Sequence, residues 1–408
     1  MAWEKVKLGD IAICIQPGPF GSQLHNSDYS ESGTPIIMPK DMIDGKISHS
    51  NLIFVGEGHT KRLCRHQVHA GNLMVARKGD VRKCVFITEN EDGWMTGSDC
   101  LKVALKENVC YPRFIYYQLR SPFIGRWLEK ISIGATMPSI NTGLLSGIEL
   151  ALPPLKEQER IADILSAYDN LIENNQKQIK LLEEAAQRLY KQWFIDLRYP
   201  GHETTKIVNG LPEGWKIVQI QDVCKNIGAG GTPSRSQKNF WENGNIDWFK
   251  TQELCDCWLF EASEKISEEG LKRSAAKMFP ANSILMAIYA SPTLGRLGIL
   301  TKEACSNQAA LCLQADESKV SNYWLYLKLF ELRDRFNSIA RGAGQQNISG
   351  IIVKETEITL PAYSVMENFT EMVKPFFEKQ KILQLQNISL TQTRDRLLPK
   401  LMNGELEV

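Results

Sequence analysis

The feature that most constrains the fold is a long stretch of helical periodicity from Leu152 to Asp196. Apolar residues recur there at two positions of a seven-residue repeat over five heptads, which is typical of a helix that packs along a partner helix. No Gly or Pro interrupts the stretch between Lys156 and Asp196, and Pro153 and Pro154 mark its start. At 1.5 Å per residue, the predicted helix is ~60 Å long.

The partner helix is predicted in the same chain, because the sequence repeats itself at a shift of 208 residues. At this shift Leu152-Pro153 aligns with Leu360-Pro361, and a second periodic stretch follows. The seam between the helices should hold Ile161, Leu165, Tyr168, Ile172, Leu182, Leu189, Phe369, Phe376, Leu383, Leu390 and Leu397. The other seam position of the second helix is more polar, with Val373, Gln380, Asn387, Arg394 and Leu401. We expect a supporting apolar stripe from Met372, Ile382, Leu385 and Ile388.

The composition indicates an ordinary intracellular protein. A length of 408 residues allows two or three domains, and a hydrophobic fraction of 43% is enough to build their cores. No apolar run approaches 18 residues and no signal-peptide pattern follows Met1, so we expect a soluble, cytoplasmic chain. Ten cysteines without a regular framework suit a reducing compartment. The net charge of +1 supports nucleic-acid binding only if positive charge gathers on one face.

Short strands and helices fill the first 151 residues. We predict β-like runs at 35–38, 52–55, 72–76, 85–87 and 101–105, and helices at 111–119 and 122–130. A polar linker at 197–214 then leads to a second copy, in which Trp215 corresponds to Trp3 and Gly71-Asn-Leu-Met to Ala281-Asn-Ser-Ile. The fold class is therefore α+β, with two similar α/β domains, two long antiparallel coiled-coil helices and a pseudo-two-fold internal repeat. The predicted boundaries are 1–151 for the first domain, 152–199 for the central helix, 200–361 for the second domain and 362–408 for the C-terminal helix.

This repeat suggests a hypothesis about function. Two copies of one domain joined by antiparallel helices would present two surfaces related by rotation. Duplex DNA offers a matching geometry, because it has local two-fold axes and its major-groove faces recur every ~34 Å. Because apolar positions are shared between the copies while loop residues differ, the two surfaces should recognise different sequences.

Candidate DNA contacts are the polar and basic residues of the Gly-rich loops. Phosphates need Arg, Lys or backbone N–H groups, and base edges need polar side chains that can donate or accept hydrogen bonds. In the first domain the candidates are Ser22, Gln23, Lys40, Arg77, Lys78, Arg82 and Lys83, the last four flanking Gly79-Asp80 in a predicted hairpin. In the second domain they are Thr232, Ser234, Arg235, Lys250, Arg273, Lys277, Tyr289, Arg296 and Gln308. The alternative for any one of them is an ordinary solvated charge.

Matching turns precede the two helices, at Gly134-Ala-Thr-Met and Gly342-Ala-Gly-Gln. Their glycines are explained by tight turns alone. Thr136, Ser139, Arg341, Gln345 and Gln346 are further candidates for contact with the DNA backbone.

The sequence carries no pattern for chemistry of its own. Cys64, His66 and His69, and likewise Cys255 and Cys257, lack the paired spacing of a zinc site, so we expect no metal. Gly228-Ala-Gly-Gly-Thr lacks the Lys-Ser/Thr ending of a phosphate loop. No Asp- or Asn-Pro-Pro-aromatic stretch for a flipped base and no catalytic triad pattern is present. We therefore expect no catalytic residues.

Several stretches resemble one known family. Leu152-Pro-Pro-Leu-Lys-Glu-Gln-Glu-Arg-Ile-Ala-Asp-Ile-Leu, Trp193-Phe-Ile-Asp-Leu-Arg-Tyr-Pro-Gly-His-Glu, Gly342-Ala-Gly-Gln-Gln-Asn-Ile and Arg396-Leu-Leu-Pro-Lys-Leu-Met-Asn-Gly-Glu-Leu resemble stretches of the specificity (S) subunit of type I restriction-modification systems. The resemblance covers the whole chain in family order, and the duplication with its two LP-led helices is its most specific part.

The resemblance implies a non-catalytic, DNA-binding specificity subunit with two target-recognition domains, each reading one half of a bipartite asymmetric site in double-stranded DNA. The helices would set the gap between the halves and dock two methyltransferase (M) subunits, and restriction (R) subunits would complete the complex. S-adenosylmethionine, ATP and Mg would be used by those partners, and this chain would hold no cofactor and meet no membrane. The alternative is a duplicated protein-binding scaffold without direct DNA contact.

Overall fold

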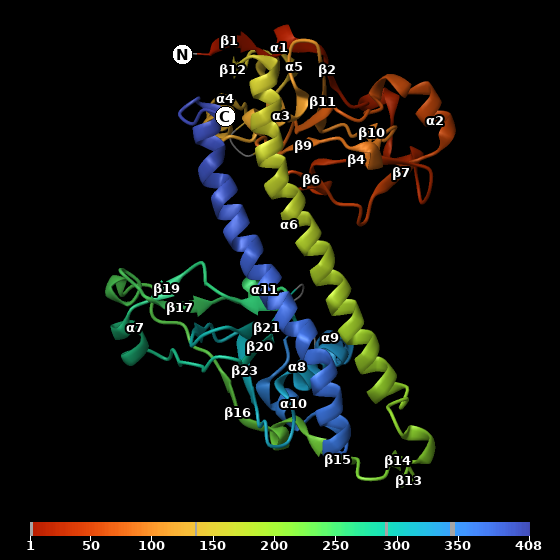
Figure 1. Ribbon diagram of the computed structural model, residues 1–408, viewed down its shortest axis with the longest axis vertical. Coiled ribbons are helices and arrows are strands. Elements are labelled where there is room, and N and C mark those ends of the chain that lie inside the picture. Colours follow the sequence, from red (N-terminus) through yellow and green to blue (C-terminus); the bar gives the residue numbers. More distant parts are fainter. Residues whose placement is uncertain (1–2, 135–136, 290–292, 343–346) are drawn as a thin grey trace. The chain divides into compact units, whose positions relative to one another are not determined.

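The computed structural model describes residues 3–134, 137–289, 293–342 and 347–408. The chain forms two compact units, the first made of Met1–Ile172 and Ser389–Val408 and the second of Glu173–Ile388 (Figure 1). Each unit contains one mixed α+β domain and one segment from each of two long helices. The predicted fold class is confirmed.

The first unit is built on two small sheets. Its strands are β1 Glu4–Lys7, β2 Ala12–Pro17, β3 Tyr29–Ser30, β4 Thr34–Ile37, β5 Met42–Ile43, β6 Lys46–Ile47, β7 Ile53–Val55, β8 Leu73–Ala76, β9 Cys84–Phe86, β10 Met95–Thr96, β11 Cys100–Leu105 and β12 Glu149–Leu152. Its helices are α1 Leu8–Ile11, α2 Glu57–Arg62, α3 Pro112–Leu119, α4 Pro122–Ile131 and α5 Thr142–Ser146. The central sheet has the order β2-β11-β8-β9, and the second sheet has the order β10-β4-β7-β3. The strands predicted from short apolar runs are thereby confirmed.

The second unit repeats this plan. Its strands are β13 Ile207–Val208, β14 Leu211–Pro212, β15 Lys216–Gln219, β16 Cys224–Ala229, β17 Ile246–Phe249, β18 Cys257–Leu259, β19 Lys265–Ile266, β20 Ile284–Ala287, β21 Leu297–Leu300, β22 Cys305–Ser306, β23 Ala310–Ala315 and β24 Glu357–Leu360. Its helices are α7 Glu268–Lys272, α8 Asn322–Glu331, α9 Arg333–Gly342 and α10 Gly350–Glu355. The central sheet, β16-β23-β20-β21-β18, contains the order of its counterpart with one added strand.

The two domains share one strand pair that joins a strand near the start of the domain to the strand before a long helix. β1 pairs with β12 so that Glu4 faces Leu152, and β15 pairs with β24 so that Lys216 faces Leu360. β1 and β15 are thus each bonded to the strand that enters a long helix.

One predicted correspondence is wrong by one residue. Gly71 matches Asn282, not Ala281, because these two residues adopt the left-handed conformation, with φ of 87° and 65°, one residue before Asn72 and Ser283. Both also donate to the strand that follows, Gly71 to Ile87 and Asn282 to Leu300.

The two long helices are α6 Leu155–Tyr190 and α11 Tyr363–Met402. α6 begins as the prolines predict, and Gln158 fixes its first turn because its side chain donates to the carbonyl of Pro153 and accepts from the N–H of Tyr111, both at 2.8 Å. A π-helical turn at Lys191–Ile195 ends it. α11 continues through Pro375 and Pro399.

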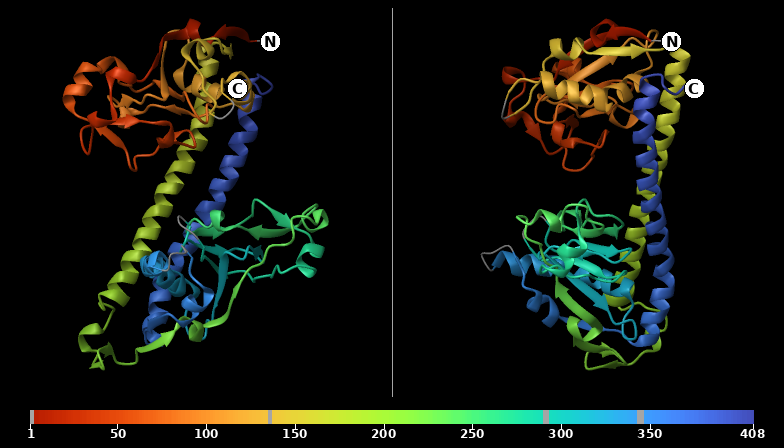
Figure 2. Two further views of the ribbon diagram at one scale, coloured as in Figure 1. Left: turned by 180° about the vertical axis from the view of Figure 1, so that it is seen from behind. Right: turned by 90° about the vertical axis from the view of Figure 1, so that its left-hand side faces the viewer.

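In the first unit the helices lie side by side and antiparallel (Figure 2). Arg394 pairs with Asp169 at 2.6 Å, whereas Arg160, earlier in α6, donates to the carbonyl of Val408, later in the chain. Around them Ile161, Leu165, Leu398 and Leu401 are buried in the domain core.

In the second unit the pairing has the same direction. Asn175 donates to Asn387 at 3.0 Å. Fifteen residues later in α6, Tyr190 packs against Phe369, which lies earlier in α11, with ring centroids 6.1 Å apart. Asn175 therefore occupies a seam position and has a polar partner on the other helix.

The predicted seam residues differ in burial. Ile161, Leu165, Ile172, Phe369 and Leu383 are buried, and Tyr168, Leu182, Leu189, Phe376, Leu390 and Leu397 are half-buried. The predicted supporting stripe is wrong, because Met372, Ile382, Leu385 and Ile388 are all exposed. In the more polar seam position Val373, Gln380 and Leu401 are buried instead. One partner helix covers a narrow stripe, so apolar residues beside it stay at the surface.

No helix in the described part of the chain is both long enough and apolar enough to cross a membrane.

Phe369 provides a test of the helix pairing. Its side chain is fully buried, and its ring centroid lies 4.7 Å from that of Phe194 and 5.7 Å from that of Trp193. We expect Phe369→Ala to lower the free energy of unfolding by about 3–5 kcal/mol, measured by urea denaturation. The matched control Phe123→Ala removes a ring that is 67% exposed and should change it by less than about 0.5 kcal/mol. Equal losses in both variants would contradict the packing.

Candidate nucleic-acid interface

In both domains the candidate loops are joined by the same set of four backbone hydrogen bonds, which we call the backbone frame. In the first domain its hydrogen bonds run from Gly18 N–H to Cys100 O (3.2 Å), Gly97 N–H to Ile37 O (2.9 Å), Arg77 N–H to Asp99 O (2.7 Å) and Ile140 N–H to Arg77 O (2.9 Å). In the second domain they run from Gly230 N–H to Ala310 O (3.1 Å), Asn307 N–H to Phe249 O (3.0 Å), Ile288 N–H to Ala309 O (2.9 Å) and Ile348 N–H to Ile288 O (3.0 Å). The frame therefore defines which loop positions correspond.

Glycine is required where this frame is tightest. A Cβ on Gly18 would lie 2.1 Å from the carbonyl oxygen of Gly97, and one on Gly230 would lie 2.2 Å from that of Ser306. Both glycines let the loop after the first central strand approach the backbone of the second sheet.

Four of the five basic candidates of the first domain lie in the β8–β9 hairpin, and the pairing of these strands confirms the predicted hairpin. The guanidinium of Arg77 lies over the ring of Phe20, 5.5 Å from its centroid. Lys78 pairs with Asp99 at 3.1 Å. Arg82 bonds Asp80 at 2.9 Å, and this bond holds the pKa of Asp80 below its ordinary value.

Arg82 also lies 3.2 Å from Glu129, so two carboxylates engage it. Lys83 instead donates to the carbonyl of Pro39 at 3.0 Å. Next to Pro39, Lys40 is exposed and donates to the carbonyl of Asn51. Lys78 and Arg82 are thus paired with carboxylates, Lys83 bonds a backbone oxygen, and Lys40 bonds a backbone oxygen with Asp41 3.9 Å away.

Three further candidates of the first domain lie on adjoining loops. Ser22 and Gln23 form a short 3-10 turn, and the carbonyl of Gln23 accepts from Arg62 at 2.7 Å. Ser139 forms an antiparallel bridge with Lys78, which brings the turn before α5 beside the hairpin.

In the second domain five of the nine candidates gather around Gly231. Thr232 donates to Gln308, and Ser234 bonds Ser236 at 2.8 Å. Arg235 and Lys250 both pair with Glu264, and the bonds from Arg235 and Lys250 hold the pKa of Glu264 below its ordinary value.

Aromatic rings support this cluster. The guanidinium of Arg235 lies 3.6 Å from the centroid of Trp241, and Trp241 meets Trp248 edge to face at 5.0 Å. Trp248 donates from its indole N–H to the carbonyl of Gly231 at 2.9 Å. The arginine is thus held flat on a ring, which lowers the entropy lost when it binds a planar partner.

The remaining second-domain candidates lie on other segments. Arg273 pairs with Glu269 one helical turn away, and Lys277 is exposed. Tyr289 is 41% exposed and bridges Asn347, whereas Arg296 is half-buried at the end of the β20–β21 hairpin. Thr136, Gln345, Gln346 and the side chain of Arg341 lie outside the described residues.

Corresponding positions carry different side chains. Lys78 matches Tyr289, Arg77 matches the buried Ile288, and Asp99 matches Ala309. Counting from the frame, the further matched pairs are Phe20 with Thr232, Met38 with Lys250, and Ser98 with Gln308. One backbone therefore presents two chemically distinct surfaces.

Sequence reasoning missed the residues that orient the candidates. Phe20 and Trp241 stack under arginines, and Glu264 holds two cations, yet none of the three was predicted. Trp241 follows Arg235 by six residues after a Gly-rich turn, which was the available pattern for it, whereas the partner of Phe20, Arg77, comes from another segment. Glu264 could not be found this way, because its partners Arg235 and Lys250 come from other segments of the chain.

The described residues contain no group of three or more His, Cys, Asp and Glu side chains placed to hold a metal ion. The candidate side chains are hydrogen-bonding, cationic and aromatic, which are the types that recognise phosphates and base edges.

Comparisons with known proteins agree over the whole chain. A profile of the family described as "Type I restriction modification DNA specificity domain" matches residues 2–184 and 212–392. The MjaIX type I restriction enzyme specificity subunit of Methanocaldococcus jannaschii is 25% identical, and the match covers 100% of this chain and 94% of that one. The HindI specificity subunit of Haemophilus influenzae is 23% identical, with 99% of each chain covered.

A solved structure shares the fold. The type I restriction-modification S subunit from M. genitalium superposes with a TM-score of 0.62 at 15% identity, covering 98% of this chain and 96% of that one.

The Glu264 cluster leads to a prediction about pH. Because the folded protein favours the carboxylate, the cluster should stabilise the second domain fully above the ordinary pKa of about 4.5. This contribution should disappear as the pH falls through the lowered pKa of the folded state. We expect Glu264→Gln to cost roughly 0.5–1 kcal/mol at pH 7, because the pairs are partly exposed, and progressively less below pH ~4.5.

Urea denaturation across pH measures this difference. The control Glu242→Gln changes an exposed carboxylate for which no hydrogen bond or ion pair is found among the described residues, so its effect should be near zero at every pH. A Glu264→Gln effect that did not depend on pH would contradict the prediction.

Proposed function

Because the chain belongs to the type I restriction-modification DNA specificity family, we propose that each of its two α+β domains reads one half of a bipartite, asymmetric site in double-stranded DNA. The long helices set the gap between the halves and dock two methyltransferase subunits. The chain itself is not an enzyme, and restriction subunits complete the assembly.

The observation that carries this proposal is the common backbone frame with different side chains. Base edges are distinguished by hydrogen-bond donors and acceptors placed at fixed positions. The two domains keep the same backbone but carry different side chains at matched positions, such as Lys78 against Tyr289 and Met38 against Lys250. Such a pair of domains is suited to reading two different half-sites in the same manner. A duplicated scaffold that bound one protein twice would not need this divergence.

The charges of the loops fit a recognition role at near-neutral net charge. Arg77, Lys83, Lys277 and Arg296 make no ion pair within 4 Å among the described residues, so they can meet phosphates. Five other candidates, Lys78, Arg82, Arg235, Lys250 and Arg273, are paired with carboxylates and would have to exchange these partners for DNA. Affinity should therefore fall steeply with salt, because phosphate contacts release counterions.

Catalysis is assigned to the partners. Methyltransferase subunits would use S-adenosylmethionine, and restriction subunits would use ATP and Mg. Purified chain alone should transfer no label from S-adenosylmethionine to DNA, and transfer by the chain alone would exclude the non-catalytic assignment.

Substitutions of Lys78 and Tyr289 test whether each domain reads one half of the site. We expect Lys78→Ala and Tyr289→Ala each to weaken binding of the assembled methyltransferase to its site by about 1–3 kcal/mol. Each variant should relax the sequence requirement in one half only, measured with DNA that carries mismatches in either half. Lys61→Ala, which removes a lysine with a side chain 82% exposed on α2, is the control and should bind as wild type. Wild-type binding to DNA by all three variants would favour the protein-scaffold alternative.

The gap can be tested by lengthening both helices. Inserting seven residues into α6 and seven into α11 keeps the heptad seam and adds about 10 Å, or roughly three base pairs. Sequencing of methylated adenines in host DNA should show a longer gap between unchanged halves. The same insertion within the linker at 197–214 should leave the gap as it is. An unchanged gap in the helix variant would contradict the spacer role.

A further inference from the structure

The backbone of Arg77 is fixed on both sides. Its N–H donates to the carbonyl of Asp99 at 2.7 Å, and its carbonyl accepts from the N–H of Ile140 at 2.9 Å. Both bonds belong to the backbone frame, and Arg77 directly follows Ala76, the last residue of β8. The central sheet and the turn before α5 therefore set where the side chain of Arg77 starts.

The side chain of Arg77 is held by an aromatic ring. Its guanidinium lies over Phe20, 5.5 Å from the ring centroid, which is within the range of a cation–π contact. Phe20 is 53% exposed, but Gly18 and Pro19 before it are buried, and Gly18 is bonded to Cys100. The ring thus stands at the surface on a fixed piece of backbone. An arginine stacked in this way loses less freedom when it binds a partner.

No acceptor meets this guanidinium among the described residues. Arg77 is half-buried, and within the described ranges its side chain forms no hydrogen bond or ion pair. The carboxylate of Asp99 pairs with Lys78 at 3.1 Å instead. Arg82 of the same hairpin is already engaged by Asp80 and Glu129. The N–H donors of Arg77 are therefore available to a ligand.

Guanine is the base that fits such a group. In the major groove it presents two acceptors, O6 and N7, and an arginine can bond both at once. An unpaired arginine can also meet a phosphate, but a phosphate contact does not need a planar group held in one orientation, whereas a bidentate bond to a base edge does. The fixed backbone and the ring beneath Arg77 supply that orientation.

The second domain has other side chains at these two positions. Ile288 corresponds to Arg77 and is only 4% exposed, and Thr232 corresponds to Phe20 and donates to Gln308. Arg235 does lie on a ring, that of Trp241, but it is paired with Glu264. At this place in the backbone frame, the unpaired stacked arginine is a feature of the first domain.

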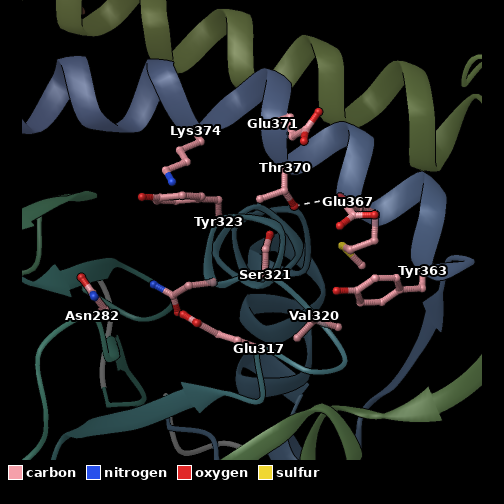
Figure 3. A pocket seen from close by; sticks show the side chains of 12 residues that line it. Asn282, Glu317, Val320, Ser321, Tyr323, Tyr363, Glu367, Thr370, Glu371 and Lys374 are labelled. Atoms are coloured by element: carbon pink, nitrogen blue, oxygen red, sulfur yellow. Dashed lines mark hydrogen bonds between the residues drawn. The ribbon is translucent and has the colours of Figure 1, made fainter.

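The opposite end of the first central sheet offers a matched arginine. Gly71 lies at that end, before β8, and lines a hollow of about 360 Å³ together with Arg113 and α6. Arg113 is also half-buried and lies over a ring, 4.3 Å from the centroid of Phe86. The second domain has a corresponding hollow before β20, where Figure 3 shows Glu367 and Tyr363 on α11 and Glu317 on the facing segment. Arg113 thus has the same stacking as Arg77 but lies away from the recognition loops.

We propose that Arg77, oriented by Phe20, reads a guanine in the half-site of the first domain through O6 and N7. This rests on the proposed function and assigns one base pair of the site to a named side chain. Phe20 is a positioning residue, because it acts through Arg77. The second domain makes no such contact at the matched position, where Ile288 is buried.

Base analogues test this contact. The site is first read by sequencing of methylated adenines in host DNA, and each guanine in it is then replaced by 7-deazaguanine, which loses N7 and keeps its pairing with cytosine. The assembled methyltransferase carries the wild-type chain, Arg77→Ala, Phe20→Leu or the control Arg113→Ala. Affinity for each DNA is measured by titration at two salt concentrations.

With the wild-type chain, the analogue at one guanine should lower affinity about tenfold, because one charged hydrogen bond is lost. Arg77→Ala should abolish this effect and accept other bases at that position. Phe20→Leu should reduce discrimination there about twofold to fivefold. Its salt dependence should equal that of the wild type, because Arg77 keeps its charge. Arg113→Ala should keep the wild-type response at every guanine.

Two results would overturn the guanine contact and leave the proposed function intact. One is an Arg77→Ala chain that keeps the wild-type response at every guanine. The other is a uniform loss of affinity for all sequences in Arg77→Ala, which would make Arg77 a phosphate contact. No preference of the wild-type assembly for its own site would overturn the proposed function itself.

Discussion

The pairing of β1 with β12, and of β15 with β24, is the constraint on which the rest of the structure depends. β1 with β12, and β15 with β24, keep the same register relative to the leucine that precedes the helix-starting proline. Because Pro153 and Pro361 follow at once, the start of each helix is fixed by the sheet of its own domain. In the first domain Gln158 adds two hydrogen bonds to this fixation, so a change in the strand pair would redirect the helix.

The two ends of each central sheet differ in how well the two domains agree. Loops at one end share a backbone frame and differ in side chains, whereas the hollows at the other end keep matching carboxylates, Glu107 with Glu317 and Glu159 with Glu367. A duplicated protein that met two different targets and one repeated partner would be under these two opposite constraints. The two domains can therefore be compared position by position within one chain, and this comparison separates the positions that differ from those that are kept.

Much of the architecture was predictable because it depends on local periodicity. Apolar runs located strands such as β8 and β11, and the heptads and prolines located α6. The exposed stripe from Met372 to Ile388 was not, because periodicity gives the apolar face of a helix without showing how much of it one partner covers. The shift of one residue between Gly71 and Asn282 was also hidden, because Asn can replace Gly in a left-handed turn. The candidate loop residues could be chosen from the sequence by type, but the pairing of Arg82, Arg235 and Lys250 with carboxylates depends on tertiary contacts.

Polar pairs in the helix seam favour register over maximal stability. An apolar seam with a seven-residue repeat can slip by one heptad and still bury similar side chains. In the second unit Asn175 meets Asn387, and a slip would leave both amides without partners. In the first unit Arg394 meets Asp169, which also accepts a hydrogen bond from Tyr117 at 2.6 Å, and a slip would leave a half-buried charge unpaired. If the helices set the gap between two half-sites, as proposed, a slipped register would change the length of that gap. A seam whose register is fixed by two polar pairs is therefore better suited to a spacer than a uniformly apolar seam.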